Sequence, residues 1–252
     1  MLPTYTSLGP VDAPPIVLVH GVRLSRGMWH AQLQGLSGAF RVIALDLPGH
    51  GALRDRPFAW DEAVETIAGV VDEAAGGRAI VAGLSLGGYL AMDLAIRQPE
   101  RVAGLVVSGA SAEPRGLLLP TAIRSLARVM DATSPARLEQ LNRAWFRRRY
   151  PAAMANAVLA GGFAFRGGAD ALRQLVGREF RGRLGAYPGP TLILNGQFDP
   201  PFRLGARGFA EAAAHGRIVT IRGATHLVNL DRPSAFSAAL GRFAAEATRR
   251  SR

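Results

Sequence analysis

The chain has 252 residues, 48% hydrophobic and 19% charged, a balance that suits one large folded domain and excludes a disordered chain. The absence of cysteine excludes disulfides, thiolate metal sites and a Cys nucleophile. All 30 basic residues behind the formal charge of +11 are Arg and are spread along the chain, so we expect no nucleic-acid partner. Without a signal-peptide pattern or an apolar run of roughly 18 residues, we expect a cytoplasmic protein with no membrane partner.

Short apolar runs alternate with helical patterns along the first part of the chain. Turn residues bound the apolar runs, as is typical of buried parallel strands. In chain order these elements are the strand Pro15–His20, the helix Met28–Leu36, the strand Arg41–Asp46, the helix Asp61–Ala75, the strand Ala79–Gly83, the helix Leu86–Arg97 and the strand Val102–Gly109. The alternation predicts an α/β fold with a doubly wound, mostly parallel sheet and right-handed crossovers.

The alternation is interrupted once, from Ala112 to about Tyr187, by a stretch that reads as three or four Arg-rich helices. We interpret residues 112–186 as a helical cap inserted into a single domain, 1–252, whose core is 1–111 and 187–252. A cap of this kind covers the carboxyl ends of the strands, where open α/β sheets bind ligands. After it come the strand Thr191–Gly196, the helix Arg203–Ala214, the strand Arg217–Gly223 and the helix Pro233–Thr248.

A serine stands where the strand Ala79–Gly83 passes directly into a helix, in the run Gly83-Leu84-Ser85-Leu86-Gly87. A sharp strand-to-helix turn holds its central residue in a strained backbone conformation, and glycines on both sides remove Cβ atoms that would collide there. A capping serine would explain the hydroxyl but not both glycines. The pattern therefore predicts that Ser85 is a nucleophile.

A serine hydroxyl needs a base to accept its proton and a third group to orient that base. His226 follows the last predicted strand, and Asp199 follows the strand Thr191–Gly196. Taken singly, they suit a loop histidine and a turn aspartate before Pro200. Their chain order after Ser85 is that of the strand-to-helix nucleophile turn, and it predicts a catalytic Ser85, Asp199 and His226.

An acyl-transfer site also needs backbone N–H donors for the oxyanion, each worth roughly 3–4 kcal/mol. The N–H of Leu86, next to the nucleophile, is one predicted donor. The second comes from the loop after the strand Pro15–His20, where Val22 is the candidate. His20 itself is expected to be structural. Three further residues of this loop are candidates for the substrate pocket: Arg23, Leu24 and Trp29.

With these residues in place, the sequence resembles the α/β-hydrolase superfamily, in its Ser-Asp-His form with an inserted helical cap. The matching landmarks are "HG" at 20–21, "DLPGHG" at 46–51, "GLSLGG" at 83–88, "NGQFD" at 195–199 and "GATHLVNLDRP" at 223–233. The resemblance implies that the family's nucleophile, acid and base correspond to Ser85, Asp199 and His226. It also implies that its oxyanion donors correspond to the N–H groups of Val22 and Leu86, and that His50 is structural.

The N-terminus departs from the family pattern. Members usually begin with an antiparallel strand pair, whereas only "TYTSLG" precedes the first predicted strand here. We therefore expect the first strand to be missing or very short. An exposed sheet edge of that kind would favour association into a homo-oligomer.

Three functions remain compatible with the sequence. We favour a serine hydrolase that forms an acyl-enzyme with a small-molecule ester, lactone or thioester. The same residues would serve a carbon–carbon bond hydrolase of diketone-like acids, in which Arg124, Arg128, Arg143 or Arg147 of the cap would hold a substrate carboxylate. The third is a protein that keeps these residues but performs no hydrolysis, either a ligand-binding protein or a cofactor-free catalyst on the same fold. Because no metal-ligand spacing or dinucleotide fingerprint is visible, we expect no metal and no organic cofactor.

Overall fold

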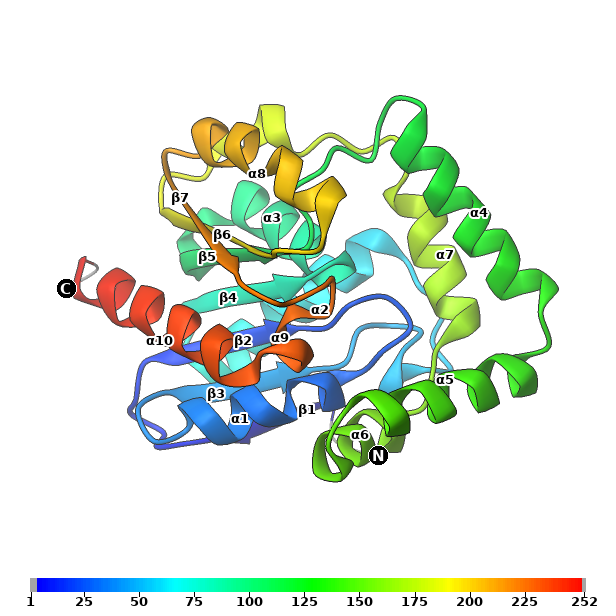
Figure 1. Ribbon diagram of the computed structural model, residues 1–252. Coiled ribbons are helices and arrows are strands. Elements are labelled where there is room, and N and C mark those ends of the chain that lie inside the picture. The colour runs from blue at the N-terminus through cyan, green and yellow to red at the C-terminus, as the bar shows by residue number, and fades with distance from the viewer. Residues whose placement is uncertain (1–3, 251–252) are drawn as a thin grey trace.

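A computed structural model describes residues 4–250. Within them, seven strands form one sheet in the order β1-β3-β2-β4-β5-β6-β7 (Figure 1). The strands are β1 (Tyr5–Leu8), β2 (Pro15–Val19), β3 (Arg41–Leu45), β4 (Ala79–Leu84), β5 (Val102–Ser108), β6 (Pro190–Gly196) and β7 (His215–Ile221). All neighbours pair in parallel except β1, which is antiparallel to β3. The predicted doubly wound, mostly parallel sheet is confirmed.

The first strand, which the sequence predicted to be missing or very short, is present and very short. β1 has four residues and pairs with β3 from Tyr5 opposite Leu45 to Leu8 opposite Val42. It therefore lies beyond β3 and forms the edge of the sheet on that side. Association through this edge stays a prediction.

Helices cover both faces of the sheet because successive side chains of a strand point to opposite sides. In β2, Ile16 and Leu18 belong to one hydrophobic core and Val17 and Val19 to the other. The first core lies under α1 (His30–Leu36) and α10 (Pro233–Arg250), and the second under α2 (Trp60–Ala75), α3 (Leu86–Arg97) and α8 (Pro200–Ala212) (Figure 1). Burial on both faces explains why the strands read as continuous apolar runs.

Four α-helices lie in the chain between β5 and β6 and stand beyond one end of the sheet (Figure 1). They are α4 (Leu118–Ala132), α5 (Pro135–Arg149), α6 (Ala152–Ala160) and α7 (Phe165–Leu175). α4 packs against α7, and α6 packs against the short 3-10 helix η1 (Arg26–Trp29), which follows β2. The remaining short helices are η2 (Gly51–Leu53), η3 (Pro99–Arg101), η4 (Arg181–Ala186) and α9 (Val228–Asp231). None of the helices in the described part of the chain is long and apolar enough to cross a membrane.

Candidate active site

Ser85 occupies a strained turn between β4 and α3. Its backbone angles are φ 56° and ψ −118°, in a region that residues with a Cβ rarely adopt. A Cβ on Gly83 would overlap the carbonyl of Gly87, and a Cβ on Gly87 would overlap the carbonyl of Val19. The two glycines therefore let β4, its neighbour β2 and the start of α3 approach closely enough to form the turn.

The turn brings the Ser85 hydroxyl out of the core. Ser85 is the one residue between Ala79 and Ala95 that is not buried. It makes no side-chain capping bond to α3, and its hydroxyl has no hydrogen-bond partner within residues 4–250. The hydroxyl is therefore available to a base or a ligand.

Ser85 lines a cavity of about 470 Å³ between the carboxyl ends of the strands and the helices α4, α5 and α7. Most of its wall is apolar. The lining residues are Gly21, Val22, Arg23, Leu24, Leu84, Ser85, Tyr89, Leu119, Ala122, Ile123, Leu126, Trp145, Phe146, Leu172, Leu175, Asp199, Phe202, Thr225, His226 and Leu227. A volume of this size suits a small organic ligand.

Asp199 and His226 meet in the same cavity. Asp199 lies between β6 and α8, and His226 lies between β7 and α9. Nδ1 of His226 and Oδ2 of Asp199 are 2.8 Å apart. Asp199 is 6% exposed, so its carboxylate is held away from water beside the imidazole.

Two further contacts hold this pair in place. The N–H of Phe198 donates to the carbonyl of Ala224 at 2.8 Å, which ties the loop of Asp199 to the loop of His226. Gly109, after β5, has a φ of 55°, and a Cβ there would press against the His226 ring at 2.9 Å. A larger residue at position 109 would displace the imidazole from Asp199.

Two backbone donors flank Ser85. The N–H groups of Val22 and Leu86 make no hydrogen bond to another residue in the part of the chain that the structure describes. Val22 lines the cavity, and Leu86 opens α3, where backbone N–H groups and the helix dipole favour negative charge. An anionic oxygen near Ser85 would find both donors unpaired.

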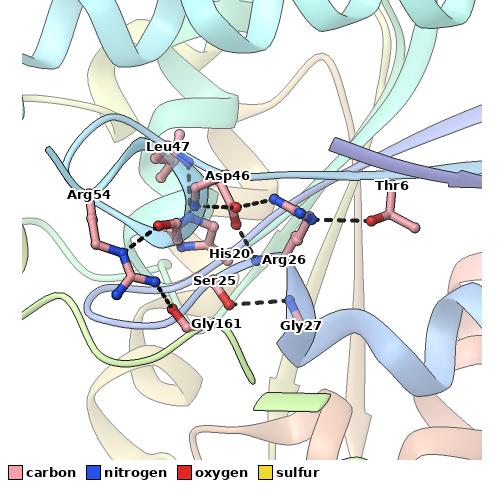
Figure 2. A network of polar contacts seen from close by, with 11 residues as sticks. Thr6, His20, Ser25, Arg26, Gly27, Asp46, Leu47, Arg54 and Gly161 are labelled. Carbon is pink, nitrogen blue, oxygen red and sulfur yellow. Dashed lines mark hydrogen bonds and ion pairs between the residues drawn. The ribbon is translucent and has the colours of Figure 1, made fainter. Parts of the chain in front are cut away.

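The loop that carries Val22 is held by a partly buried polar network (Figure 2). Asp46, after β3, accepts from the backbone N–H of Arg26 at 2.7 Å and from that of Ala52 at 2.9 Å, and it also forms an ion pair with the Arg26 guanidinium. Arg54 donates to the carbonyls of Gly51 and Gly161, so the segment after α6 is tied to the same network. These bonds tie the loop after β2 to the segment after β3 and to the segment after α6.

His20 belongs to this network as a neutral imidazole. Its Nε2 accepts the N–H of Leu47 at 3.0 Å (Figure 2). Its Nδ1 therefore carries the proton, and it lies 2.9 Å from the carbonyl of Gly21. If Nε2 carried a proton, its N–H would face the N–H of Leu47 and the hydrogen bond between them would be lost. Burial lowers the pKa of His20 to about 4, and burial together with the neighbouring His20 lowers the pKa of His50 to about 3. Both histidines are fully buried and neither lines the cavity, which is consistent with the structural role expected from the sequence.

These two histidines predict a pH-dependent stability. Between pH 6.5 and about 4 they take up protons in the unfolded chain but not in the folded one, so the free energy of unfolding decreases as the pH falls. We expect a loss of about 2–4 kcal/mol between pH 7 and pH 5, measured by urea unfolding. The variant His215→Gln, at an exposed histidine, should keep the same profile. Stability that does not change over this range would contradict the assignment.

The three residues predicted to line the substrate pocket do not all lie in the cavity wall. Arg23 and Leu24 line the cavity, but Trp29 does not. Trp29 is fully buried, with its ring 5.7 Å from that of Phe236 of α10, so the pocket prediction for it is wrong. Its helix η1 turns the ring toward the sheet, where a large apolar side chain gains more from burial than at a cavity wall.

The structure adds residues that sequence reasoning missed. Tyr89 lines the cavity one helical turn after Ser85, and this spacing on α3 could have indicated it. Phe202 of α8 lies with its ring 5.1 Å from that of His226, and no local pattern marks it. The four cap arginines considered as carboxylate ligands, Arg124, Arg128, Arg143 and Arg147, do not line the cavity.

Comparison with known proteins identifies the family. The sequence profile of the alpha/beta hydrolase family matches residues 16–239, and the chain belongs to this family. Over 238 residues it is 26% identical to 3-oxoadipate enol-lactonase 1 of Acinetobacter baylyi, an alignment that covers 90% of this chain and 87% of that protein.

Two further similarities differ in extent. The chain is 38% identical to pimeloyl-[acyl-carrier protein] methyl ester esterase of Nitrosomonas europaea over 96 residues, which are 38% of this chain and only 37% of that relative. Among solved structures, the enol-lactonase from Burkholderia xenovorans LB400 superposes with a TM-score of 0.81 at 25% identity and covers 95% of each chain. The likeness in fold therefore extends over nearly the whole chain.

Proposed function

We propose that this protein is a serine hydrolase that cleaves a small carboxylic ester, lactone or thioester through an acyl-enzyme. The observation that carries this proposal is the convergence of Ser85 and the Asp199–His226 pair in one cavity. The relatives described above, which are named as an enol-lactonase and a methyl ester esterase, support the same class of substrate.

In the first half-reaction His226 takes the proton of Ser85 as the oxygen attacks the substrate carbonyl. Asp199 accepts the Nδ1–H of His226, which keeps Nε2 unprotonated in the resting enzyme and stabilises the imidazolium that forms. His226 then protonates the leaving group. The hydrogen bond from the Ser85 hydroxyl to Nε2 of His226 forms when substrate closes the cavity and excludes water.

The oxyanion of the tetrahedral intermediate is held by the N–H groups of Val22 and Leu86. Both donors are unpaired within residues 4–250, so they lose no existing hydrogen bond when the charge develops. In the second half-reaction water attacks the acyl-enzyme with His226 as the base. The free acid is then released, and Ser85 recovers its proton.

Residues 112–186 act as a cap that sets the size of the substrate. Leu119 and Ile123 of α4 and Leu172 of α7 form apolar wall opposite Ser85. Leu126 and Trp145 line the cavity while 41% and 47% exposed, so the entrance lies between α4 and α5. An apolar cavity of about 470 Å³ favours a short acyl group over a long one.

Product analysis tests the proposed function. Purified protein is incubated with a short methyl ester, a five-membered enol lactone and an acyl thioester, and the released acid is quantified by liquid chromatography. We expect at least one of the three to be cleaved. A diketone-like acid is included as a fourth substrate: cleavage of it alone would show a carbon–carbon bond hydrolase, and turnover of none of the four by folded protein would favour a non-hydrolytic protein.

A further inference from the structure

Arg23 has an unusual backbone and a place in the cavity wall. It follows the proposed oxyanion donor Val22 directly, and its φ of 59° makes it, with Ser85, one of two non-glycine residues with positive φ among those the structure describes. Gly168 of α7 lies against it, since a Cβ there would sit 3.4 Å from the Arg23 backbone nitrogen. A strained residue of this kind persists only where the surrounding structure holds it, and such residues gather at binding and catalytic sites.

The Arg23 side chain is partly buried yet has no partner. Its guanidinium makes no hydrogen bond or ion pair within residues 4–250, and burial lowers its pKa. Other arginines of comparable burial are paired: Arg26 with Asp46, and Arg97 with Asp61 and Asp93. A guanidinium that has lost water without gaining a counter-ion costs free energy, and a bound anion would offset that cost.

Beyond the two backbone N–H groups at Ser85, which are assigned to the reacting oxygen, Arg23 is the only cationic side chain in the described cavity lining that has no carboxylate partner. The other ionisable side chains in this lining are Tyr89, Asp199 and His226. Tyr89 donates to the carbonyl of Ala112, burial raises its pKa well above the ordinary value, and Asp199 is engaged with His226. Asp199 would repel an anion at the Ser85 end, so an anionic group is directed toward Arg23.

We propose that Arg23 binds a carboxylate of the substrate, so that the preferred substrate is a small ester or lactone that carries one free carboxylate besides the bond to be cleaved. This inference rests on the proposed function and names the substrate class of the same site. A single guanidinium in an otherwise apolar wall matches the single charge of a carboxylate, and its planar fork suits a bidentate carboxylate contact. The larger charge of a phosphate monoester would remain partly unpaired.

The inference is tested with two substrates that differ only in charge: the 4-nitrophenyl monoester of glutaric acid, and the same compound with its carboxylate capped as a methyl ester. We expect wild-type kcat/KM for cleavage of the nitrophenyl ester to be at least about tenfold higher for the anionic compound. Arg23→Gln should lower kcat/KM for the anion about 10–100-fold and for the neutral compound less than about threefold. Arg23→Lys, which keeps the charge, should retain part of the preference.

A surface arginine supplies the matched control. Arg137 of α5 is exposed and outside the cavity, so Arg137→Gln should leave both rates unchanged. If Arg23→Gln lowers both substrates equally, or changes neither, the inference is overturned. A loss confined to the neutral substrate would overturn the inference as well.

A binding measurement separates this inference from the proposed function. Glutarate itself is titrated calorimetrically into Ser85→Ala and into Ser85→Ala/Arg23→Gln. We expect binding to the first and at least tenfold weaker binding to the second. Dependence of glutarate binding on Arg23 in a protein that cleaves no ester would uphold the carboxylate site and reject the hydrolase. If the protein cleaves esters but binds glutarate equally well with and without Arg23, the carboxylate site is rejected and the hydrolase is retained.

Discussion

Replacing Ser85 by Ala is expected to lower kcat on a 4-nitrophenyl ester by about 10⁵–10⁶-fold, because the acyl-enzyme can no longer form. The hydroxyl makes no capping bond to α3, so its removal should leave the thermal midpoint within a few degrees of the wild type. Steady-state kinetics and thermal unfolding on the same preparation measure both. Nearly complete loss of activity in a fully folded variant is the expected combination.

The matched control for this change is Ser125→Ala, at an exposed position of α4 outside the cavity. It should keep wild-type kinetics. Retention of a tenth or more of the activity in Ser85→Ala would mean that another group or a directly activated water attacks the substrate, and the acyl-enzyme mechanism would then be wrong.

Replacing Asp199 by Asn is expected to lower kcat by about 10⁴-fold while the fold is preserved. The carboxylate accepts the Nδ1–H of His226 at 2.8 Å, whereas an amide can turn its NH₂ toward that nitrogen and select the tautomer that carries its proton on Nε2. Such an imidazole cannot accept the Ser85 proton. Kinetics with a saturating 4-nitrophenyl ester measure the change.

Asp12→Asn, at an exposed loop position before β2, serves as the comparison and should not alter kcat. A loss of less than about tenfold in Asp199→Asn would show that another residue orients His226. Circular dichroism of the variant separates a loss of chemistry from a loss of folding.

The positions of the three proposed site residues could be predicted because each of them lies in the turn or loop that follows a strand. β4, β6 and β7 are parallel neighbours or near neighbours in one sheet, so the residues after their carboxyl ends meet at one edge. Ser85 carried an additional local signal in Gly83 and Gly87, since only a close approach of backbone segments requires glycine on both sides of a serine. Local pattern and tertiary position agree here.

The residues that were missed or misplaced depend on packing between distant segments. Trp29 was assigned to the pocket from its place near the loop after β2, but its ring lies against Phe236, more than 200 positions away. Phe202 reaches His226 through the course of α8. The unpaired state of Arg23 depends on which carboxylates surround it in space, and a single sequence does not contain that information.

The inserted helices illustrate the same limit. Their helical character followed from the absence of strand patterns between β5 and β6, and α4 to α7 have that character. Which of their faces line the cavity could not be predicted, because α4 presents Leu119 and Ile123 to the cavity and Arg124 and Arg128 to solvent through packing against α7. The cap arginines considered for a substrate carboxylate therefore lie outside the cavity, whereas Arg23, next to Val22, lies in its wall.

Mass spectrometry after treatment with a fluorophosphonate tests the central claim most directly, because this probe reacts with an activated serine without any knowledge of the substrate. The account predicts one adduct, on the peptide that contains Ser85. The adduct should be lost in Ser85→Ala and strongly slowed in His226→Ala. An unlabelled Ser85 in folded wild-type protein, or equal labelling without His226, would contradict it.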